Sequence, residues 1–503
     1  MSRARHVKCD EGKPSCTRCT SAARTCKGYQ TPNAIRPSSL PVKITYYVPP
    51  PQHLSISLVP FQGNEKERRA FAFFCERTAK CFQSEFSSLH LLRAANEEPA
   101  IRHAVIALGG IHEFRGLEKE RLNGIPPTDP FSERQYGKAI TLLLNSTQMS
   151  SKQSTEVFLL SCILFACFES LRGHIKSAIT HVTCGLKLLH QTETADTLAS
   201  FAYVPQKTIR SLFTRLDNQM MELGGSLLLT MLREKERLAP PFSELKDPET
   251  FKNLEGAYES FDIFLNRTLH VHRTLEMLLA DPLGFSDPET LLLKIETERG
   301  KCLQYLDRWS RAFNHHFIRD GPRRERSSDY NIYVLQIWRV TAKLLHSVKL
   351  TDTEETWDQF QPEFNTIVTL AEALVETSYI TNTSSQGIPS FSFHLGILPP
   401  LFLTSIRCRD LIIRRRAVHI LSSSRRCEGM WDSHLAATVA RYVIDAEEKD
   451  GWQSPPGIET YQRHNFSAGN IRALRVKDVL VAYDDSTLPQ IKLNWAGERR
   501  SEN

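Results

Sequence analysis

Apolar residues recur at helical spacing along most of this 503-residue chain. Phe71, Phe74 and Cys75 stand at positions i, i+3 and i+4, the period of an α-helix that buries one face. Asn64 and Glu67 lie three residues apart just before this stripe, which is typical of a capping box at a helix start. The pattern therefore predicts that a helix begins next to Asn64.

Residues 155–191 predict a pair of helices with a break near Arg172 and Gly173. Ala178 and Gly185 in the second helix are small enough to let the two helices approach closely. Further helices are predicted near residues 207–222, 254–280, 288–317, 330–349, 356–379, 400–421 and 432–448. Because no stretch alternates apolar and polar residues between hairpin turns, the body is predicted to be all-α.

Three consecutive arginines, Arg414 to Arg416, interrupt one of these apolar stripes. They could form a second nucleic-acid patch. The preferred interpretation is that they lie on the solvated face of a helix. Its core face would then be made by Leu411, Ile412, Val418 and Leu421.

Composition is ordinary for a globular protein, with 41% hydrophobic and 24% charged residues. The longest apolar run, Val157 to Phe168, is too short to span a bilayer and indicates a buried helix instead. The N-terminus is basic and cysteine-rich and has no apolar signal segment. No membrane partner is expected, and the scattered cysteines of the body are interpreted as reduced core thiols of an intracellular protein.

The chain is predicted to have four parts. Residues 1–30 form a small N-terminal module, and the proline-rich residues 31–60 form a linker. Residues 61–450 form the helical body, and residues 451–503 form a poorly ordered tail. Because no heptad run follows the module, a coiled coil does not support dimerisation.

The four cysteines of the module follow the pattern C-x6-C-x2-C-x6-C, at Cys9, Cys16, Cys19 and Cys26. Thiolates at these spacings can converge on one tetrahedral Zn²⁺. A segment this short cannot bury an apolar core, so the metal would supply its folding energy. A disulfide framework is the alternative, and it is disfavoured without secretion.

Charge is concentrated in the same segment, because residues 1–33 carry a net charge of +5, against +6 for the whole chain. A small basic metal module on a nearly neutral body is typical of a nucleic-acid binder. The basic residues of the segment are Arg3, Arg5, Lys8, Lys13, Arg18, Arg24 and Lys27.

The run from Arg5 to Cys19, followed by Cys26-Lys27-Gly28-Tyr29, resembles the fungal zinc-cluster (Zn₂Cys₆) transcription factors. Their pattern is C-x2-C-x6-C-x6-C-x2-C-x6-C, and this chain matches its last four cysteines. The second cysteine of the family would fall at Ser2 and the first would fall before Met1. The module is therefore a partial, truncated zinc cluster as the chain is printed.

The resemblance implies two zinc ions bridged by the first and fourth cysteines, and Cys16 matches the fourth. One ion would keep only Cys9 and Cys16, whereas the other would keep Cys16, Cys19 and Cys26. Two explanations stay open: a start codon or exon lies further upstream, or the finger is degenerate. The good match of the remaining pattern favours the first, and a mononuclear Cys₄ zinc site is a further alternative.

The resemblance also assigns DNA contacts. A lysine directly before the third family cysteine reads bases of a C-G-G half-site in the major groove, and Lys8 holds that position. Phosphate contacts that set the orientation would come from Arg3, Arg5, His6 and Lys13. The alternative is a generic solvated basic tail.

Several stretches of the body resemble the helical regulatory region of the same factors. They include Glu98–Gly109, Cys162–Leu189 and Leu395–Leu401, and their order along the chain carries the resemblance. The resemblance implies a nuclear, zinc-dependent, sequence-specific regulator of RNA polymerase II transcription, with double-stranded DNA and co-regulators or the transcription machinery as partners. The alternative is a helical interaction or effector-sensing protein with a vestigial finger.

An enzyme is not expected. His112 and Glu113 begin like the zinc-protease motif H-E-x-x-H, but Gly116 stands where its second histidine must be. The chain also has no phosphate-binding glycine loop, nucleophile elbow or dinucleotide fingerprint.

Overall fold

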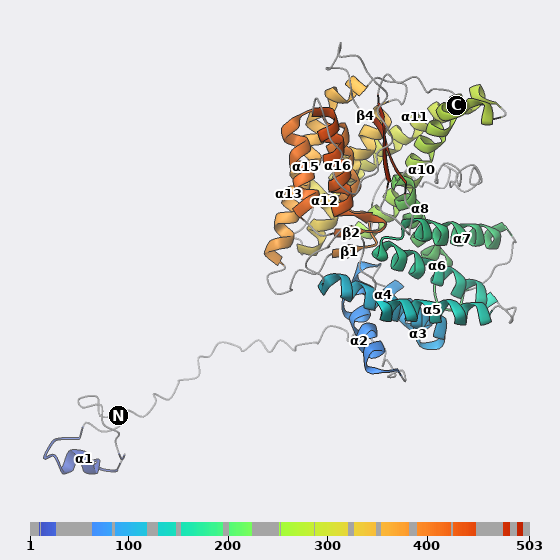
Figure 1. The fold of residues 1–503 in the computed structure, drawn as a ribbon. Coiled ribbons are helices and arrows are strands. Elements are labelled where there is room, and N and C mark those ends of the chain that lie inside the picture. The colour runs from blue at the N-terminus through green and yellow to red at the C-terminus, as the bar shows by residue number, and fades with distance from the viewer. Residues whose placement is uncertain are drawn as a thin grey trace. The chain divides into compact units, whose positions relative to one another are not determined.

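Figure 1 shows the protein as a computed structural model. The structure describes residues 10, 12–26, 63–82, 86–117, 129–146, 152–194, 201–223, 251, 253–285, 287–319, 326–348, 354–381, 390–423, 426–448, 476–482 and 490–495. The chain divides into two compact units, Met1–Ile56 and Ser57–Asn503, and each is described by itself.

The first part of the larger unit is a stack of helices, which the blue-to-green ribbon of Figure 1 shows. Helix α4 packs against α2, α5 and α6, and α6 in turn packs against α7. The helices are α2 (Glu65–Phe73), α3 (Leu91–Glu97), α4 (Pro99–Leu117), α5 (Pro130–Ser146), α6 (Lys152–Arg172) and α7 (Ile175–Thr194). Short helical segments, η1 (Phe74–Thr78), η2 (Ala79–Cys81) and η3 (Phe86–His90), connect α2 to α3.

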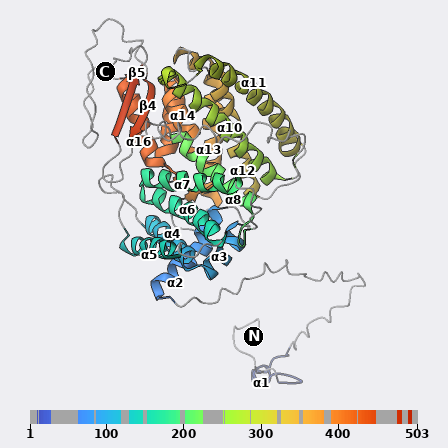
Figure 2. The ribbon, with the colours of Figure 1, turned by 90° about the vertical axis from the view of Figure 1, so that its right-hand side faces the viewer.

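A second group of helices follows, seen in green to orange in Figures 1 and 2. It contains α8 (Gln206–Leu223), α10 (Leu254–Ala280), α11 (Pro288–Phe313), α12 (Arg326–Ser347), α13 (Gln361–Thr381), α14 (Leu398–Arg407), α15 (Leu411–Ser423) and α16 (Ser433–Glu448). Three short segments, η5 (Pro282–Gly284), η6 (Asn314–Arg319) and η7 (Glu354–Phe360), flank them. Helix α10 packs against α8, α11 and α12, and α14 packs against α13, α15 and α16.

Helices α8 and α10 run parallel to one another. Arg215 of α8 pairs with Asp262 of α10, and six residues later the Met221 carbonyl accepts from Arg273. Because the residue numbers of the partners rise together, both helices point the same way. The C-terminal end of α8 therefore lies beside the C-terminal half of α10.

Two small sheets accompany the helices. In the first, β1 (Ser390–Ser392) pairs in parallel with β2 (Arg426–Glu428), which pairs antiparallel with β3 (Trp431–Asp432). The second is an antiparallel pair, β4 (Val476–Ala482) and β5 (Gln490–Trp495), visible at the edge of Figure 2. The sheets are minor parts of a helical body, so the predicted all-α class is confirmed.

One large hydrophobic core runs through the body, from Phe74 near its start to Ala437 of α16. Trp309, Trp338 and Phe213 are among its large and almost completely buried side chains. Within the described part of the chain, no helix is both long and apolar enough to cross a membrane.

The local predictions for the first helices are confirmed. Asn64 accepts from the Glu67 backbone N–H at 3.0 Å, and Glu67 accepts from the Asn64 N–H at 3.1 Å, which is the reciprocal pair of a capping box. The predicted break between α6 and α7 falls at Gly173, whose φ of 83° suits a residue without a Cβ.

One predicted helix is wrong in its extent. Residues 400–421 were expected to form one helix, but α14 ends at Arg407 and α15 begins at Leu411. Asp410 explains the restart, because its Oδ1 atom accepts from the backbone N–H groups of Ile412 and Ile413, both at 2.9 Å.

The predicted orientation of α15 is also partly wrong. Val418 and Leu421 are buried as expected, but Leu411 and Ile412 are 44% and 72% exposed. Arg414 is almost completely buried, and its guanidinium pairs with Glu447 of α16 at 2.8 Å. This buried ion pair fixes the rotation of α15 and so leaves part of its apolar stripe facing solvent. Because Arg414 is buried, it cannot belong to a nucleic-acid-binding surface.

The structure tests the predicted linker and the predicted tail unequally. The linker over residues 31–60 lies outside the described residues. The expectation of a poorly ordered tail is wrong for strands β4 and β5, whose backbones pair between Val476 and Trp495. Val479 and Leu493 of these strands pack with Tyr442 of α16. The boundaries of the four predicted parts otherwise stay predictions.

Candidate metal centre and nucleic-acid interface

The cysteine segment is built around a single helical turn, α1 (Thr17–Thr20). The Cys16 carbonyl accepts from the backbone N–H groups of Cys19 and Thr20, at 2.9 and 3.1 Å. The Asp10 carboxylate accepts from the Thr17 N–H at 3.0 Å, which satisfies a donor at the first turn. The two-residue spacing of Cys16 and Cys19 is therefore the spacing of one turn.

The chain then folds back, so that a third thiol joins the other two. Ala23 has a φ of 46°, and the Arg24 N–H donates to the Cys19 carbonyl at 3.0 Å. The sulfur atoms of Cys16, Cys19 and Cys26 consequently lie within 4.8 Å of one another. The sequence spacing had predicted this convergence.

The distances fit a zinc ion. The sulfurs of Cys16 and Cys26 are 4.0 Å apart. Zinc–sulfur bonds of about 2.3 Å at tetrahedral angles separate two ligand sulfurs by about 3.8 Å. These three residues are the ones that the zinc-cluster resemblance gives to one of its two ions.

Burial in this unit is also consistent with a metal-held fold. Among its described residues, 10 and 12–26, only Cys16 is buried, with 2% of its surface exposed. A segment with no apolar core needs another source of folding energy, and metal–thiolate bonds can supply it.

The structure tests the remaining site residues less fully. Cys9, Lys8, Arg5, Arg3 and His6 lie outside the described residues.

Lys13 is described and its side chain is exposed. Arg18 on α1 and Arg24 after it are exposed as well. Three cationic side chains next to the gathered thiols therefore reach solvent, which suits contact with an anionic partner.

The incomplete zinc-protease motif has a structural explanation. His112 Nδ1 lies 2.9 Å from Thr78 Oγ1 inside the core, and Glu113 pairs with Arg69 at 2.8 Å. The two side chains hold α4 against the preceding helices. Among the described residues, the three thiols form the only cluster of cysteine, histidine or acidic side chains with metal-binding geometry.

A thiol cluster with exposed cations, followed by a large helical body, defines the class of zinc-cluster transcription factors. The model of the fungal Zn(2)-Cys(6) binuclear cluster domain matches residues 3–34. The model of the fungal specific transcription factor domain matches residues 72–417, which is more than half of the chain. The chain belongs to this family, and it is a DNA-binding transcription regulator with zinc as its cofactor.

Two curated relatives agree with this assignment. The aspercryptin biosynthesis cluster-specific transcription regulator atnN of Emericella nidulans is 26% identical, over 89% of this chain and 86% of its own length. The transcription regulator lscL of Purpureocillium lilacinum is 26% identical over 39% of this chain and 49% of its own length. No solved structure matches the chain.

Proposed function

We propose that residues 1–30 form the DNA-reading module, held by zinc on Cys9, Cys16, Cys19 and Cys26. The three thiols that lie within 4.8 Å of one another carry the proposal. Zinc would supply the folding energy that a 30-residue segment lacks and would fix the backbone that presents the basic side chains. Cys9 would complete the ligand set.

We assign the recognition of DNA bases to Lys8. A lysine can donate to both the O6 and N7 acceptors of guanine in the major groove, which suits a C-G-G half-site. Arg3, Arg5, His6 and Lys13 would contact phosphates and set the orientation of the module on the duplex. The exposure of Lys13 supports its part of this proposal.

The cellular role follows from the class of protein. We infer that the chain acts in the nucleus on genes transcribed by RNA polymerase II, without an enzymatic activity of its own. The name of the relative atnN specifies regulation of a biosynthesis gene cluster, and we propose the same kind of target for this chain. The helical body would contact co-regulators or the transcription machinery.

Metal analysis tests the module. The 503-residue chain should bind at most one zinc, and a version with the C-x2-C of the family restored upstream should bind two. Cys19→Ser should abolish binding in the 503-residue chain, whereas Cys184→Ser, at an exposed thiol of α7, should leave it unchanged. Absence of zinc from both versions, as purified and after zinc addition, would contradict the proposed ligands.

DNA binding separates base reading from phosphate attraction in the restored version. Lys8→Ala should weaken the free energy of binding to a C-G-G site by about 1–3 kcal/mol and that to an unrelated duplex by much less. Lys13→Ala should weaken binding to all DNA sequences alike and reduce the slope of log affinity against log salt concentration by about one unit. Equal losses for Lys8→Ala on both duplexes, measured by fluorescence anisotropy, would remove Lys8 from sequence reading.

A further inference from the structure

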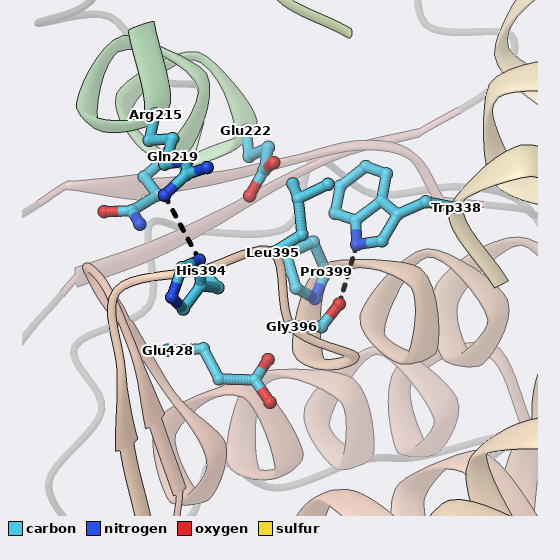
Figure 3. Close-up of a pocket in the computed structure, with 9 residues that line it drawn as sticks. All are labelled: Arg215, Gln219, Glu222, Trp338, His394, Leu395, Gly396, Pro399 and Glu428. Carbon is cyan, nitrogen blue, oxygen red and sulfur yellow. Dashed lines mark hydrogen bonds between the residues drawn. The ribbon is translucent and has the colours of Figure 1, made fainter. Parts of the chain in front are cut away.

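The cavity beside α8 is too small to hold a ligand. It lies between α8, α12, the β1–α14 segment and β2, and Figure 3 shows its side chains. Its lining includes Arg215, Gln219, Glu222 and Glu428. The free space takes one water-sized group. Any larger group that binds here has to meet the outer surface of the body instead.

The first turn of α15 exposes two adjacent apolar side chains on that surface. Leu411 is 44% exposed and Ile412 is 72% exposed, whereas Ile413 and Arg414 are buried. Single exposed leucines are common on proteins, but two neighbouring apolar side chains form a face that a packed partner can cover. We call Leu411 and Ile412 the apolar face of α15.

Polar contacts around the apolar face hold it in place. Asp410 accepts from two backbone N–H groups of the first turn and from the Gln361 side chain, the latter at 2.8 Å. Arg409 pairs with Asp358 at 2.7 Å. The charges of the rim are thus matched within the body, so the group that fits the centre is apolar.

A long segment of the chain leaves the body and returns to it beside this face. Glu447, near the end of α16, binds Arg414 of α15 through its Oε2 atom at 2.8 Å. Its Oε1 atom accepts from the Val476 backbone N–H at 3.0 Å, where β4 begins. Residues 449–475, which lie outside the described residues, therefore begin and end within a few residues of one carboxylate.

The start of this segment is within reach of the apolar face. Leu411 and Arg414 are three residues apart, so they lie on one side of the first turn of α15. Trp452 follows Glu447 by five residues, so the chain can carry it at most about 17 Å from Glu447. A helix with its side chains is about 10–12 Å wide, so the indole can also reach Ile412.

Trp452 also suits the apolar face chemically. It is the first large apolar residue after α16, because Lys449, Asp450 and Gly451 precede it. An indole buries a large apolar area, and its N–H can stay at a polar rim. The dipeptide Pro456-Gly457 follows, which is a turn signal and allows the chain to reverse towards Val476.

We propose that Trp452 packs on Leu411 and Ile412, so that residues 449–475 dock on the first turn of α15. The contact would tie the C-terminal strands to α15, in addition to the two bonds of Glu447. It would also occupy the apolar face, which would then not be open to a co-regulator. The proposal is independent of the zinc ligands and of the DNA contacts.

Tryptophan fluorescence of the full-length chain tests the contact. The difference between the spectrum of a protein and that of its Trp452→Phe counterpart isolates the emission of Trp452. In the wild type this difference spectrum should lie at short wavelength and resist quenching by acrylamide, because a packed indole is shielded from water. Ile412→Gln should shift it to longer wavelength and make it readily quenched.

Controls locate the effect on the apolar face. Leu293→Gln, at a leucine of α11 that is 70% exposed, should leave the Trp452 spectrum unchanged. If Ile412→Gln lacks a helical circular dichroism spectrum, Leu411→Gln takes its place with the same expected shift. A wild-type Trp452 that is quenched as readily as free tryptophan, or one that the folded variant leaves unshifted, would overturn the proposal.

Light scattering distinguishes the segment of the same chain from a second copy. A contact within one chain predicts the same molecular mass for the wild type and for Ile412→Gln. A dimer that Ile412→Gln dissociates would mean that a second copy covers the apolar face, and it would overturn the assignment to Trp452.

Discussion

Buried polar side chains connect segments that are far apart in the chain, and Glu156 illustrates this at the scale of one residue. Its carboxylate is completely buried in α6 and accepts from the backbone N–H groups of Ala202, Tyr203 and Val204, at 2.6 to 2.9 Å. The sequence gives no sign of this contact, because Glu156 looks like a polar residue at the edge of an apolar run. Only the fold shows that it orders the segment before α8.

His346 of α12 makes the stability of the body depend on pH. Its pKa is lowered to about 3, against 6.5 for an ordinary histidine. Burial is the main cause, and the charges of His272 and Arg299 make smaller contributions. Below pH 6.5 the unfolded chain binds a proton that the folded chain does not bind. Stability is therefore complete above pH 6.5 and falls as the pH decreases towards 3.

We expect His346→Asn to flatten this dependence by roughly 1 kcal/mol per pH unit between pH 6 and 4. Asparagine can still meet Thr268, whose hydroxyl lies 3.0 Å from the imidazole Nε2. The measurement is urea denaturation at a series of pH values. His419→Asn, at an exposed position of α15, serves as the control and should keep the wild-type slope. An unchanged slope for His346→Asn would show that His346 is not the titrating group.

At the scale of elements, helix ends were predictable where their signals are local. Helix α10 spans Leu254–Ala280, the predicted range, and the Asn253 side chain accepts from the Gly256 N–H at its start. The orientation of α15 was not predictable, because it depends on Glu447, which lies 33 residues further along the chain. A cap acts within one turn, whereas a buried ion pair acts across the core.

Two helical glycines should respond in opposite ways to the same substitution. Gly185 of α7 lies against α6 and α8, and a Cβ there would overlap the buried ring of Phe213 and approach Cys162 to 3.2 Å. A Cβ at Gly137 of α5 would have nothing within 4 Å. The first site is overpacked by alanine, and the second gains helix propensity.

We therefore expect Gly185→Ala to destabilise the body by about 1–3 kcal/mol and Gly137→Ala to stabilise it by about 0.5–1 kcal/mol. Urea denaturation followed by circular dichroism measures both. Gly185 was predicted from sequence to allow close packing, and the partner ring was not. If Gly185→Ala left the free energy of unfolding unchanged, Phe213 would be able to move aside without cost.

At the scale of the whole molecule, the two compact units differ in what holds them. The larger unit has its own continuous core, whereas the described residues of the smaller unit have no apolar core. A chain that starts at Ser57 should consequently give a helical circular dichroism spectrum and a cooperative melt. Zinc chelation should leave the melt of the full-length body unchanged. A non-cooperative melt of the shortened chain would show that the body depends on the N-terminal segment.

The metal site and the cavity differ in how far sequence could predict them. Cys16, Cys19 and Cys26 lie within eleven consecutive residues, so their spacing alone predicts that their thiols can meet. Gln219 and Glu222 are one turn apart on α8, whereas Glu428, which lines the same cavity, lies more than 200 residues further along the chain. No local pattern relates these positions, so the cavity had no signal in the sequence.

The sequence by itself determined the helical class, most helix ranges, the capping box at Asn64 and the convergence of the cysteines. These features depend on interactions within a few residues, which periodicity and spacing record directly. The tertiary structure alone decided the break between α14 and α15, the burial of Arg414, the pairing of β4 with β5 and the cavity beside α8. Each of these depends on which distant groups meet in the core, where an unpaired charge or a lost hydrogen bond is costly and a packed partner removes that cost.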